Sequence, residues 1–473
     1  MAAQAPQTAD LAALNNDNGA ATTRIPESSA ANVDIHDEVE KETRRVNIGL
    51  PNELLCQIFN LMDRLPRSNS RCWIIDEPEL AISHCEPAAH LKAISLVSKQ
   101  WHAVVLPILF KYTRIISHQP WHTSHEARKQ TQPFFDFINQ TSLNGSVISF
   151  TLAVPHRSFE VDSSFITRHV EVFWEDLFNT IDPAKVLLVA SPVALGLLTG
   201  CHVGPYNAKI YEAPYHYLHL QRAENAKSEV AKAASEQNAT QSTDPIPSKD
   251  VVASDEDGSI NPATSDLADS QPVSTLLSIR PWKRLLLNEG SFIKGYSSGG
   301  IDDFIAPAPT ILTDLFGCSQ VPDEDNDGDT DGVEPRRALI NPSISEVSYV
   351  GMFPPNRHFQ KFVHFLPAIE SVHVQLVPRN TVLHDVERMA GVVEYDLWHQ
   401  RNSAYATIVR ELFNPQPRKN YATLRKFESG DTADIDAWHM AVEFVRRSGA
   451  AVGWGVECDG VFVRDSKYVK PPQ

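Results

Sequence analysis

The sequence is poor in cysteine and lacks a long hydrophobic run. Its six cysteines are scattered over 473 residues and form no C-x-x-C pair, which is typical of reduced thiols. The longest uncharged apolar stretch, 186–201, is broken by Pro192 and by glycines, so it falls short of a membrane span. No basic start followed by an apolar run predicts a secretory signal. We therefore expect a protein of the cytoplasm, the nucleus or both, without membrane association.

Basic charge is also scarce. The chain has 42 Lys and Arg against 59 Asp and Glu, a net charge of −17. This excess of acid disfavours general nucleic-acid binding, which needs basic patches for phosphates. The nucleotide-binding patterns G-x-x-x-x-G-K-[ST] and G-x-G-x-x-G are missing as well, and we interpret the serine- and glycine-containing segment 296–303 as a flexible loop. We expect neither an enzyme nor a bound cofactor.

The most informative stretch that is present is 50–62, with the sequence LPNELLCQIFNLM. Its apolar residues recur at spacings of three and four, which predicts an amphipathic helix with a wide apolar face. Pro51 suits the first helical position, because its missing N–H would have no partner there. Glu53 places a negative charge in the first turn, where the helix dipole favours it.

A second apolar run, 90–110, predicts two short helices. The first extends to about Val97, and Ser98 is the expected N-cap of the next. Pro107 is expected to end or kink that second helix. A chain of about 45 to 60 residues buries too little surface for much stability of its own. The helices therefore either pack on the rest of this protein or keep part of their apolar face for a partner.

The two runs together, "LPNELLCQIF" and "LKAISLVSKQWHAVVLPILF", resemble an F-box, specifically the F-box that opens many large fungal F-box proteins. The Leu-Pro start, Glu-Leu-Leu, Ile-Phe, Leu-Val-Ser-Lys and Trp follow the family order within residues 50–110. One departure is the join at 63–89, which is longer than the usual one. The resemblance covers this part of the chain only.

The resemblance implies a substrate-recognition adaptor of the ubiquitin conjugation pathway. An F-box binds the linker subunit of an SCF-type cullin–RING ubiquitin ligase, while the rest of the chain captures a protein substrate. The alternatives are an F-box scaffold acting outside a ligase and an α/β enzyme without a recognisable motif. No cluster of arginines in the sequence indicates recognition of phosphate. Carried over residue by residue, the contacts with the linker subunit fall on Leu50, Pro51, Leu54, Leu55, Ile58, Phe59, Leu96, Val97 and Trp101.

Composition divides the chain into three parts. Residues 1–45 contain too little apolar and aromatic surface to fold, so we expect a disordered tail. The F-box follows at 46–110, with an insertion at 63–89. An α/β substrate-binding domain is expected at 111–473. It is interrupted by a disordered insertion at 221–272, which has no aromatic residue, and by an acidic loop at 319–337.

Strand and helix patterns alternate through the expected substrate-binding domain. A closing hairpin is predicted at 452–464, with a type I′ turn at Asp459-Gly460. The predicted strands are 112–116, 147–154, 186–189, 345–350, 371–377 and 424–428, and 282–287 is either a strand or the end of a helix. The predicted helices are 134–140, 169–181, 193–198, 357–366, 381–389, 396–413 and 435–448.

The fold class is predicted to be α+β or α/β, with the helical F-box first. Segments 173–190 and 359–376 share a plan of helix, turn and apolar strand. This plan favours an irregular leucine-rich-repeat-like layout, with short parallel strands on one face and helices on the other. The period is irregular and no asparagine ladder is visible, so a plain α/β domain remains the alternative.

The acidic loop contains an EF-hand-like pattern. Asp323, Asp325, Asp327 and Glu334 match the calcium-binding spacing, which needs carboxylate oxygens around one ion. Prolines stand on both sides of the loop, where helices should continue, and Thr330 occupies the position of a bulky aliphatic residue. We therefore interpret the match to the EF-hand pattern as accidental and the segment as an acidic loop without structure. A weak calcium site is the alternative.

Two groups of histidines are candidate metal ligands. His118, His122 and His125 with Glu126 have spacings compatible with zinc on a helix, but Pro120 interrupts that helix. We interpret them as a solvated loop. His216 and His219 are expected to pack beside the tyrosines of "YHYLH". No metal site is therefore predicted.

Overall fold

A computed structural model describes the chain at residues 50–63, 89–117, 124–154, 163–203, 210–211, 215–223, 275–297, 308–317, 338–378, 382–414, 416, 418, 420–432 and 434–465. Contacts divide the chain into two units, Met1–Pro51 and Asn52–Gln473, and every helix and strand below belongs to the second. The predicted tail at 1–45 and acidic loop at 319–337 lie outside the described residues, as do most of the insertions at 63–89 and 221–272.

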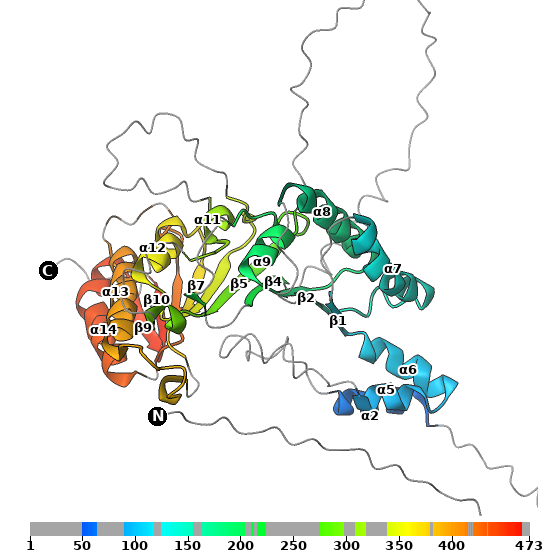
Figure 1. The fold of residues 1–473 in the computed structure, drawn as a ribbon. Helices are drawn as coiled ribbons and strands as arrows, with labels where there is room; N and C mark the ends of the chain where they lie inside the picture. The colour runs from blue at the N-terminus through cyan, green and yellow to red at the C-terminus, as the bar shows by residue number, and fades with distance from the viewer. Residues whose placement is uncertain are drawn as a thin grey trace, which may run out of the picture. The chain divides into compact units, whose positions relative to one another are not determined.

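Among the described residues, three short helices lie at the start of the second unit (Figure 1). They are α2 (Asn52–Met62), α5 (Ala89–Ser95) and α6 (Lys99–Leu109). The hydroxyl of Ser98 accepts a hydrogen bond from the backbone N–H of Trp101, so Ser98 is the predicted N-cap of α6. Pro107 lies in the last turn of α6, which ends two residues later.

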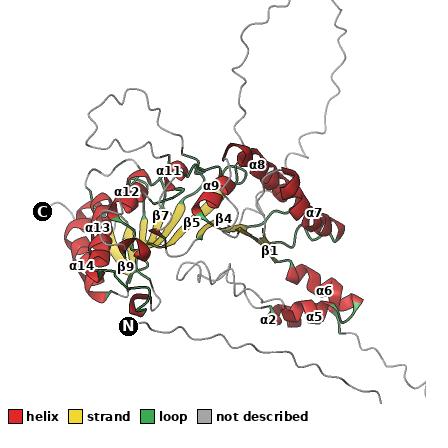
Figure 2. Ribbon diagram, in the orientation of Figure 1, coloured by secondary structure: helices red, strands yellow, loops and turns green. Residues whose placement is uncertain are grey.

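The described strands form one ten-stranded sheet (Figure 2). Strands β1 to β8 follow one another in sequence order, and β10 and then β9 complete the sheet. β4 runs antiparallel to both of its neighbours, and the neighbours of β10 are also antiparallel to it, whereas the other pairs are parallel. The strands are β1 (Tyr112–Ile116), β2 (Ser149–Val154), β3 (Lys185–Ala190), β4 (His216–Arg222), β5 (Trp282–Ser291), β6 (Glu346–Met352), β7 (Ser371–Gln375), β8 (Lys426–Ser429), β9 (Trp454–Cys458) and β10 (Val461–Arg464).

The helices of the α/β part line one side of this sheet (Figure 1). Crossovers between parallel strands are right-handed, so a strand order that advances in one direction puts successive helices on the same face. None of the described helices is long and apolar enough to cross a membrane. They are α7 (Ser124–Gln140), α8 (Ser163–Thr180), α9 (Pro192–Thr199), α11 (Leu312–Leu315), α12 (Asn356–Phe365), α13 (Glu394–Leu412) and α14 (Ile435–Ser448).

Side chains alternate between the two faces of the sheet, as the pleat requires. In β3, Val186 and Leu188 belong to the large core under the helices, whereas Leu187 and Val189 belong to a small cluster on the other face. The large core takes residues from every strand between β2 and β8 and from all the helices between α7 and α14. Burial of this one face therefore holds the described α/β part together.

The predicted mixed α/β class is confirmed, and most predicted elements are present with bounds shifted by a few residues. Segment 282–287 is a strand that continues to Ser291. The helix predicted at 134–140 begins earlier, at Ser124. β4 was not predicted, and residues 221 and 222, which were expected to open the disordered insertion, belong to this strand, where Arg222 is buried and pairs with Asp182 at 2.6 Å.

Two local predictions were wrong. The helix predicted at 381–389 is only a short 3-10 turn, Val382–His384, followed by turns. The carboxylate of Asp385 accepts hydrogen bonds from the backbone N–H groups of Glu387 and Arg388, which offers the backbone an alternative to helix.

The closing hairpin is present, but its turn is not type I′. That type needs positive φ at both central residues, and of this pair only Gly460 has it, at 81°. The ladder shifts register between Val461 and Phe462, so an extra residue is absorbed beside the turn as a bulge.

Candidate functional site

The three N-terminal helices form a small bundle with its own core. Leu55 and Phe59 of α2 are 1% and 2% exposed, and they pack with Leu91, Val105 and Ile108. The rings of Phe59 and Trp101 meet edge to face with centroids 5.4 Å apart. An aromatic pair in this geometry contributes about 0.5–1.5 kcal/mol beyond its buried area.

The same helices also carry large apolar side chains that their own core does not cover. Leu54 and Ile58 are 45% and 43% exposed, one helical turn apart on α2. The side chain of Gln100 donates to that of Asn52 at 2.9 Å, so the start of α6 lies beside the start of α2. The turn before α6 also exposes Leu96 and Val97. We call the exposed apolar side chains of the described bundle the apolar stripe: Leu54, Ile58, Leu61, Met62, Leu96 and Val97.

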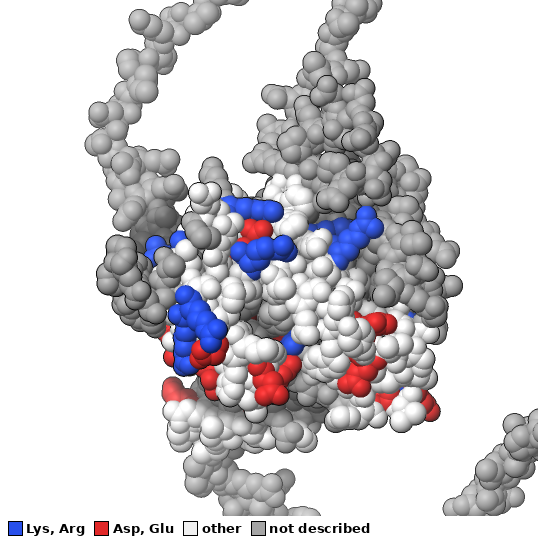
Figure 3. Space-filling model, turned by 90° about the vertical axis from the view of Figure 1, so that its left-hand side faces the viewer, with Lys and Arg blue, Asp and Glu red and all other residues white. Residues whose placement is uncertain are grey.

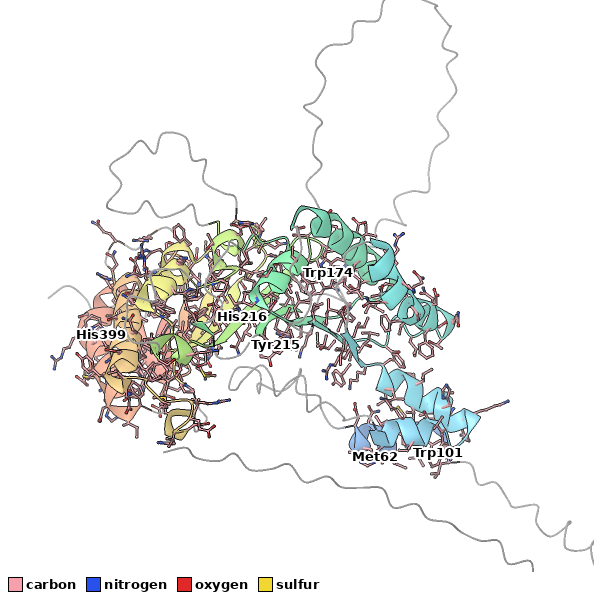
Figure 4. All side chains as sticks on the ribbon, in the orientation of Figure 1. Met62, Trp101, Trp174, Tyr215, His216 and His399 are labelled. Atoms are coloured by element: carbon pink, nitrogen blue, oxygen red, sulfur yellow. The ribbon has the colours of Figure 1, made fainter. Side chains whose placement is uncertain are left out.

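The residues carried over from the F-box resemblance thus divide into two groups. Leu55 and Phe59 are buried and Trp101 is half-buried, so these three hold the bundle together. Leu54, Ile58, Leu96 and Val97 are exposed. Leu50 and Pro51, which belong to the other unit of the chain, are exposed as well. Figure 4 labels Met62 and Trp101 on the bundle.

The sheet face opposite the helices is a second candidate surface. Cross-strand register aligns a row of polar side chains across it, and the guanidinium of Arg284 pairs with the carboxylate of Glu346 at 2.6 Å. On the same face, the next row of the sheet contains Leu187 and Leu286, which are apolar and buried, and Ser348, which is polar and half-buried. The first row is Lys185, Gln221, Arg284, Glu346, Ser371 and Lys426.

A buried carboxylate forms the most connected polar cluster of the core. Glu289 of β5 is 0% exposed and accepts hydrogen bonds from Thr310 at 2.5 Å, Tyr349 at 2.8 Å and His358 at 2.7 Å. Burial alone would raise the pKa of Glu289, but the charge and hydrogen bond of His358 and the charge of His216 lower it to about 2. The cluster lies in the protein interior, and each donor comes from a different segment, so it fixes α12 and the segment before α11 to the sheet.

The two histidines of β4 are buried, but the ring partner of His216 among the described residues is Tyr211 and not one of the tyrosines of "YHYLH" beside which it was expected to pack. Burial lowers the pKa of His216 to about 4 and that of His219 to about 3, so both side chains are neutral near pH 7. The ring of His216 packs edge-on against Tyr211, with centroids 4.4 Å apart; Figure 4 labels His216 and Tyr215 at the sheet.

Residues 295–299 spell G-x-S-x-G, a pattern of serine hydrolases that the prediction of no enzyme motif overlooked; they overlap the segment 296–303, which is predicted to be a flexible loop. In such enzymes the serine sits on a strained turn directly between a strand and a helix. Here Ser297 follows a 3-10 turn with φ −89°, and its hydroxyl donates to the carbonyl of Lys294 at 2.7 Å. The described geometry around Ser297 is therefore not a nucleophile elbow.

Within the described residues, no three His, Cys, Asp or Glu side chains are grouped so that they could hold a metal ion. The EF-hand-like residues Asp323, Asp325, Asp327 and Glu334 lie outside the described residues, as do His118 and His122. His125 and Glu126 fall in α7, where their side chains are not described.

No family model, no curated protein and no solved structure matches the chain. The function is therefore argued from the two surfaces described above.

Proposed function

We propose that the protein is a substrate-recognition adaptor of an SCF-type cullin–RING ubiquitin ligase. Its helical bundle binds the linker subunit and through it a cullin, and its α/β domain binds a protein substrate in the cytoplasm or nucleus. The adaptor does no bond chemistry. It raises the effective concentration of substrate beside the ubiquitin-carrying enzyme.

One observation carries this proposal: the bundle fills its own core and still exposes an apolar stripe. Leu61 and Leu96 are 88% and 85% exposed. Large apolar side chains left exposed on a small bundle are typical of sites that bind another protein. This arrangement supports the F-box resemblance of residues 50–110, because a family member keeps part of its helices for the linker subunit.

The proposal extends to the fold and to the substrate surface. The sequential strand order and the helices along one face support a leucine-rich-repeat-like reading of the α/β domain. In that reading the substrate binds on the face opposite the helices, where Arg284, Glu346 and Lys426 lie in one row. Charged groups in such a row favour specificity for a complementary partner.

The test is a pull-down of the full chain from a fungal extract, read for the linker subunit and the cullin together. We expect both with the native chain and neither with the double variant Leu54→Glu/Ile58→Glu, which places two charges in the stripe. Asn60→Glu is the matched control, because Asn60 is also exposed on α2 but lies on another side of the helix.

Three outcomes separate the alternatives. If the native chain brings down the linker subunit without the cullin, the protein is a scaffold that acts outside a ligase. If it brings down neither protein, the F-box assignment is wrong. Undiminished binding by the double variant, with Asn60→Glu also unchanged, contradicts the role given to the stripe.

A further inference from the structure

Helix α14 carries large apolar side chains on the side that faces away from the sheet. Trp438, Val442 and Val445 are buried against the core. Met440 and Phe444 lie one helical turn apart, and they are 69% and 44% exposed. Two apolar residues at this spacing on an exposed helix side are suited to packing against another helix.

A charge of opposite sign lies at each end of this apolar pair. Asp436 is in the first turn of α14 and Arg447 in the last, and both are exposed. With 3.6 residues per turn, positions 436, 440, 444 and 447 fall on one side of the helix. Among the described residues, neither Asp436 nor Arg447 forms an ion pair. We call Asp436, Met440, Phe444 and Arg447 the α14 face.

The helix as a whole carries no net charge. Residues 435–448 include two acidic and two basic side chains, in a chain whose net charge is −17. Glu443, beside the α14 face, pairs with Arg446 at 2.8 Å, so its charge is offset within the helix. The repulsion that keeps strongly charged proteins apart is therefore not concentrated on this helix.

Helix α13 extends the surface, because it lies beside α14 and runs parallel to it. Arg401, in the middle of α13, pairs with Asp434 at the start of α14 at 3.1 Å. Phe413, at the end of α13, packs on Phe444 with ring centroids 5.6 Å apart. α13 also has acidic residues in its first turn and Arg410 in its last. The acidic ends of both helices therefore point the same way, and so do the basic ends.

The ordinary explanation for this charge pattern is the helix dipole, which favours acidic residues at the N-terminus and basic residues at the C-terminus. Figure 3 views the end of the molecule that carries these helices, with most Lys and Arg toward one end of the face and most Asp and Glu toward the other. The dipole accounts for the positions of Asp436 and Arg447. It does not account for the exposure of Met440 and Phe444 between them.

We propose that the α14 face binds the α14 face of a second copy of this chain, with the two helices antiparallel about a two-fold axis. This arrangement brings Asp436 opposite Arg447 of the second copy and Met440 opposite Phe444, so each copy uses the same surface. A parallel arrangement would place like charges opposite each other. Charge complementarity selects a second copy, because an occupant must carry the same groups in reverse order and the rotated helix supplies them.

The inference gives the C-terminal end of the α/β part a partner, and it does not depend on the proposed ubiquitin-ligase function. Two pairs of short helices bury an area at the lower end of the range for specific interfaces. We therefore expect a dimer that dissociates at roughly micromolar concentration.

The test is sedimentation equilibrium of the full chain between about 1 and 100 µM. The average mass should rise from 52.6 kDa toward twice that value. The chain with Leu54→Glu/Ile58→Glu is measured as well, so that association through the apolar stripe of the bundle is recognised.

Charge reversals test the pairing. Asp436→Lys and Arg447→Glu each place like charges opposite one another, so each alone should raise the Kd of the dimer about tenfold or more. The double variant Asp436→Lys/Arg447→Glu restores opposite charges and should dimerise like the native chain. It keeps both substitutions that oppose the helix dipole, so its recovery cannot come from a more stable helix. Lys129→Glu on α7 is the matched control, because Lys129 is also exposed and its charge is reversed in the same way.

Two further measurements apply if a charge reversal disturbs the fold. Met440→Glu changes a side chain that is 69% exposed, and it should also weaken the dimer. A one-to-one mixture of the two single charge variants should dimerise, because each supplies the charges that the other needs.

Four results would overturn the inference. A chain that stays monomeric up to about 100 µM leaves the α14 face to a different partner. A dimer that is lost in Leu54→Glu/Ile58→Glu forms through the bundle instead. A dimer that neither charge reversal weakens does not use the charged ends, and a double variant as weak as the single ones contradicts the antiparallel pairing.

Discussion

Two adjacent leucines of α2 should respond to truncation in opposite ways. Leu55 is 1% exposed in the bundle core and Leu54 is 45% exposed in the apolar stripe. Truncating a buried leucine to alanine costs about 2–5 kcal/mol through lost burial and the cavity left behind. Among the described residues, the bundle core has five buried apolar side chains, so Leu55→Ala should open the bundle.

Leu54→Ala should leave the bundle folded and weaken binding of the linker subunit instead. Full burial of a leucine contributes about 1.5–3 kcal/mol. With 45% of Leu54 exposed for a partner to cover, the loss is about 0.7–1.4 kcal/mol, or roughly three- to tenfold in affinity.

Hydrogen exchange of the α2 and α6 amides and calorimetric titration of purified linker subunit would measure both effects. Leu55→Ala should raise exchange throughout the bundle, whereas Leu54→Ala should change affinity alone. If Leu55→Ala left exchange unchanged, the packing of α2 described above would be wrong. If Leu54→Ala left affinity unchanged, the stripe would not be the binding surface.

Three further predictions concern the α/β part. Glu289→Gln removes the charged partner of His358 from a fully buried cluster, so it should lower the free energy of unfolding, measured in urea, by about 3–5 kcal/mol. Glu346→Gln at the surface should lower it by less than about 1 kcal/mol. Equal losses would contradict the structural role of the cluster. The pKa values of His216 and His219 are about 4 and about 3, below an unfolded value of about 6.5. Their contribution to stability is therefore present above pH 6.5 and is lost as the pH falls toward 4 and 3, by about 1.4 kcal/mol per pH unit for each histidine. Replacing one of them with leucine should reduce the slope of unfolding free energy against pH between pH 6 and 4 by up to about 1.4 kcal/mol per pH unit, and an unchanged slope would show that the residue is not buried neutral. Gly460→Ala should destabilise the hairpin by about 1–3 kcal/mol, because φ is +81° and the new Cβ would lie 2.9 Å from the Thr432 side chain; a similar thermal midpoint for Gly145→Ala and Gly460→Ala would contradict this.

The candidate sites show which features could be predicted from residue patterns in the sequence and which could not. The pattern of α2 and the cap Ser98 predicted the helices of the bundle, because both signals are local. The split of Leu54 from Leu55 was not predicted, since both belong to the wide apolar face and only the position of α6 decides which is covered.

β4 was missed for a related reason. Its polar residues His216, His219 and Arg222 gave no apolar strand pattern from which an element could be predicted, but each is buried in the folded chain. Arg222 is tolerated there because Asp182 lies 2.6 Å away. A buried polar side chain needs such a partner, and a partner 40 residues away cannot be read from the local pattern.

The sequence by itself determined the order, type and approximate bounds of most helices and strands, because hydrophobic period, caps and turn residues act over a few residues. It also determined which helices have an apolar face. Only the tertiary structure decided the strand order, the single face that carries the helices, and the pairing of polar groups such as Asp431, which accepts hydrogen bonds from the backbone N–H of Leu376 and the hydroxyl of Tyr405. These features depend on contacts between residues far apart in the chain, whose free energy exists only when the whole sheet is assembled.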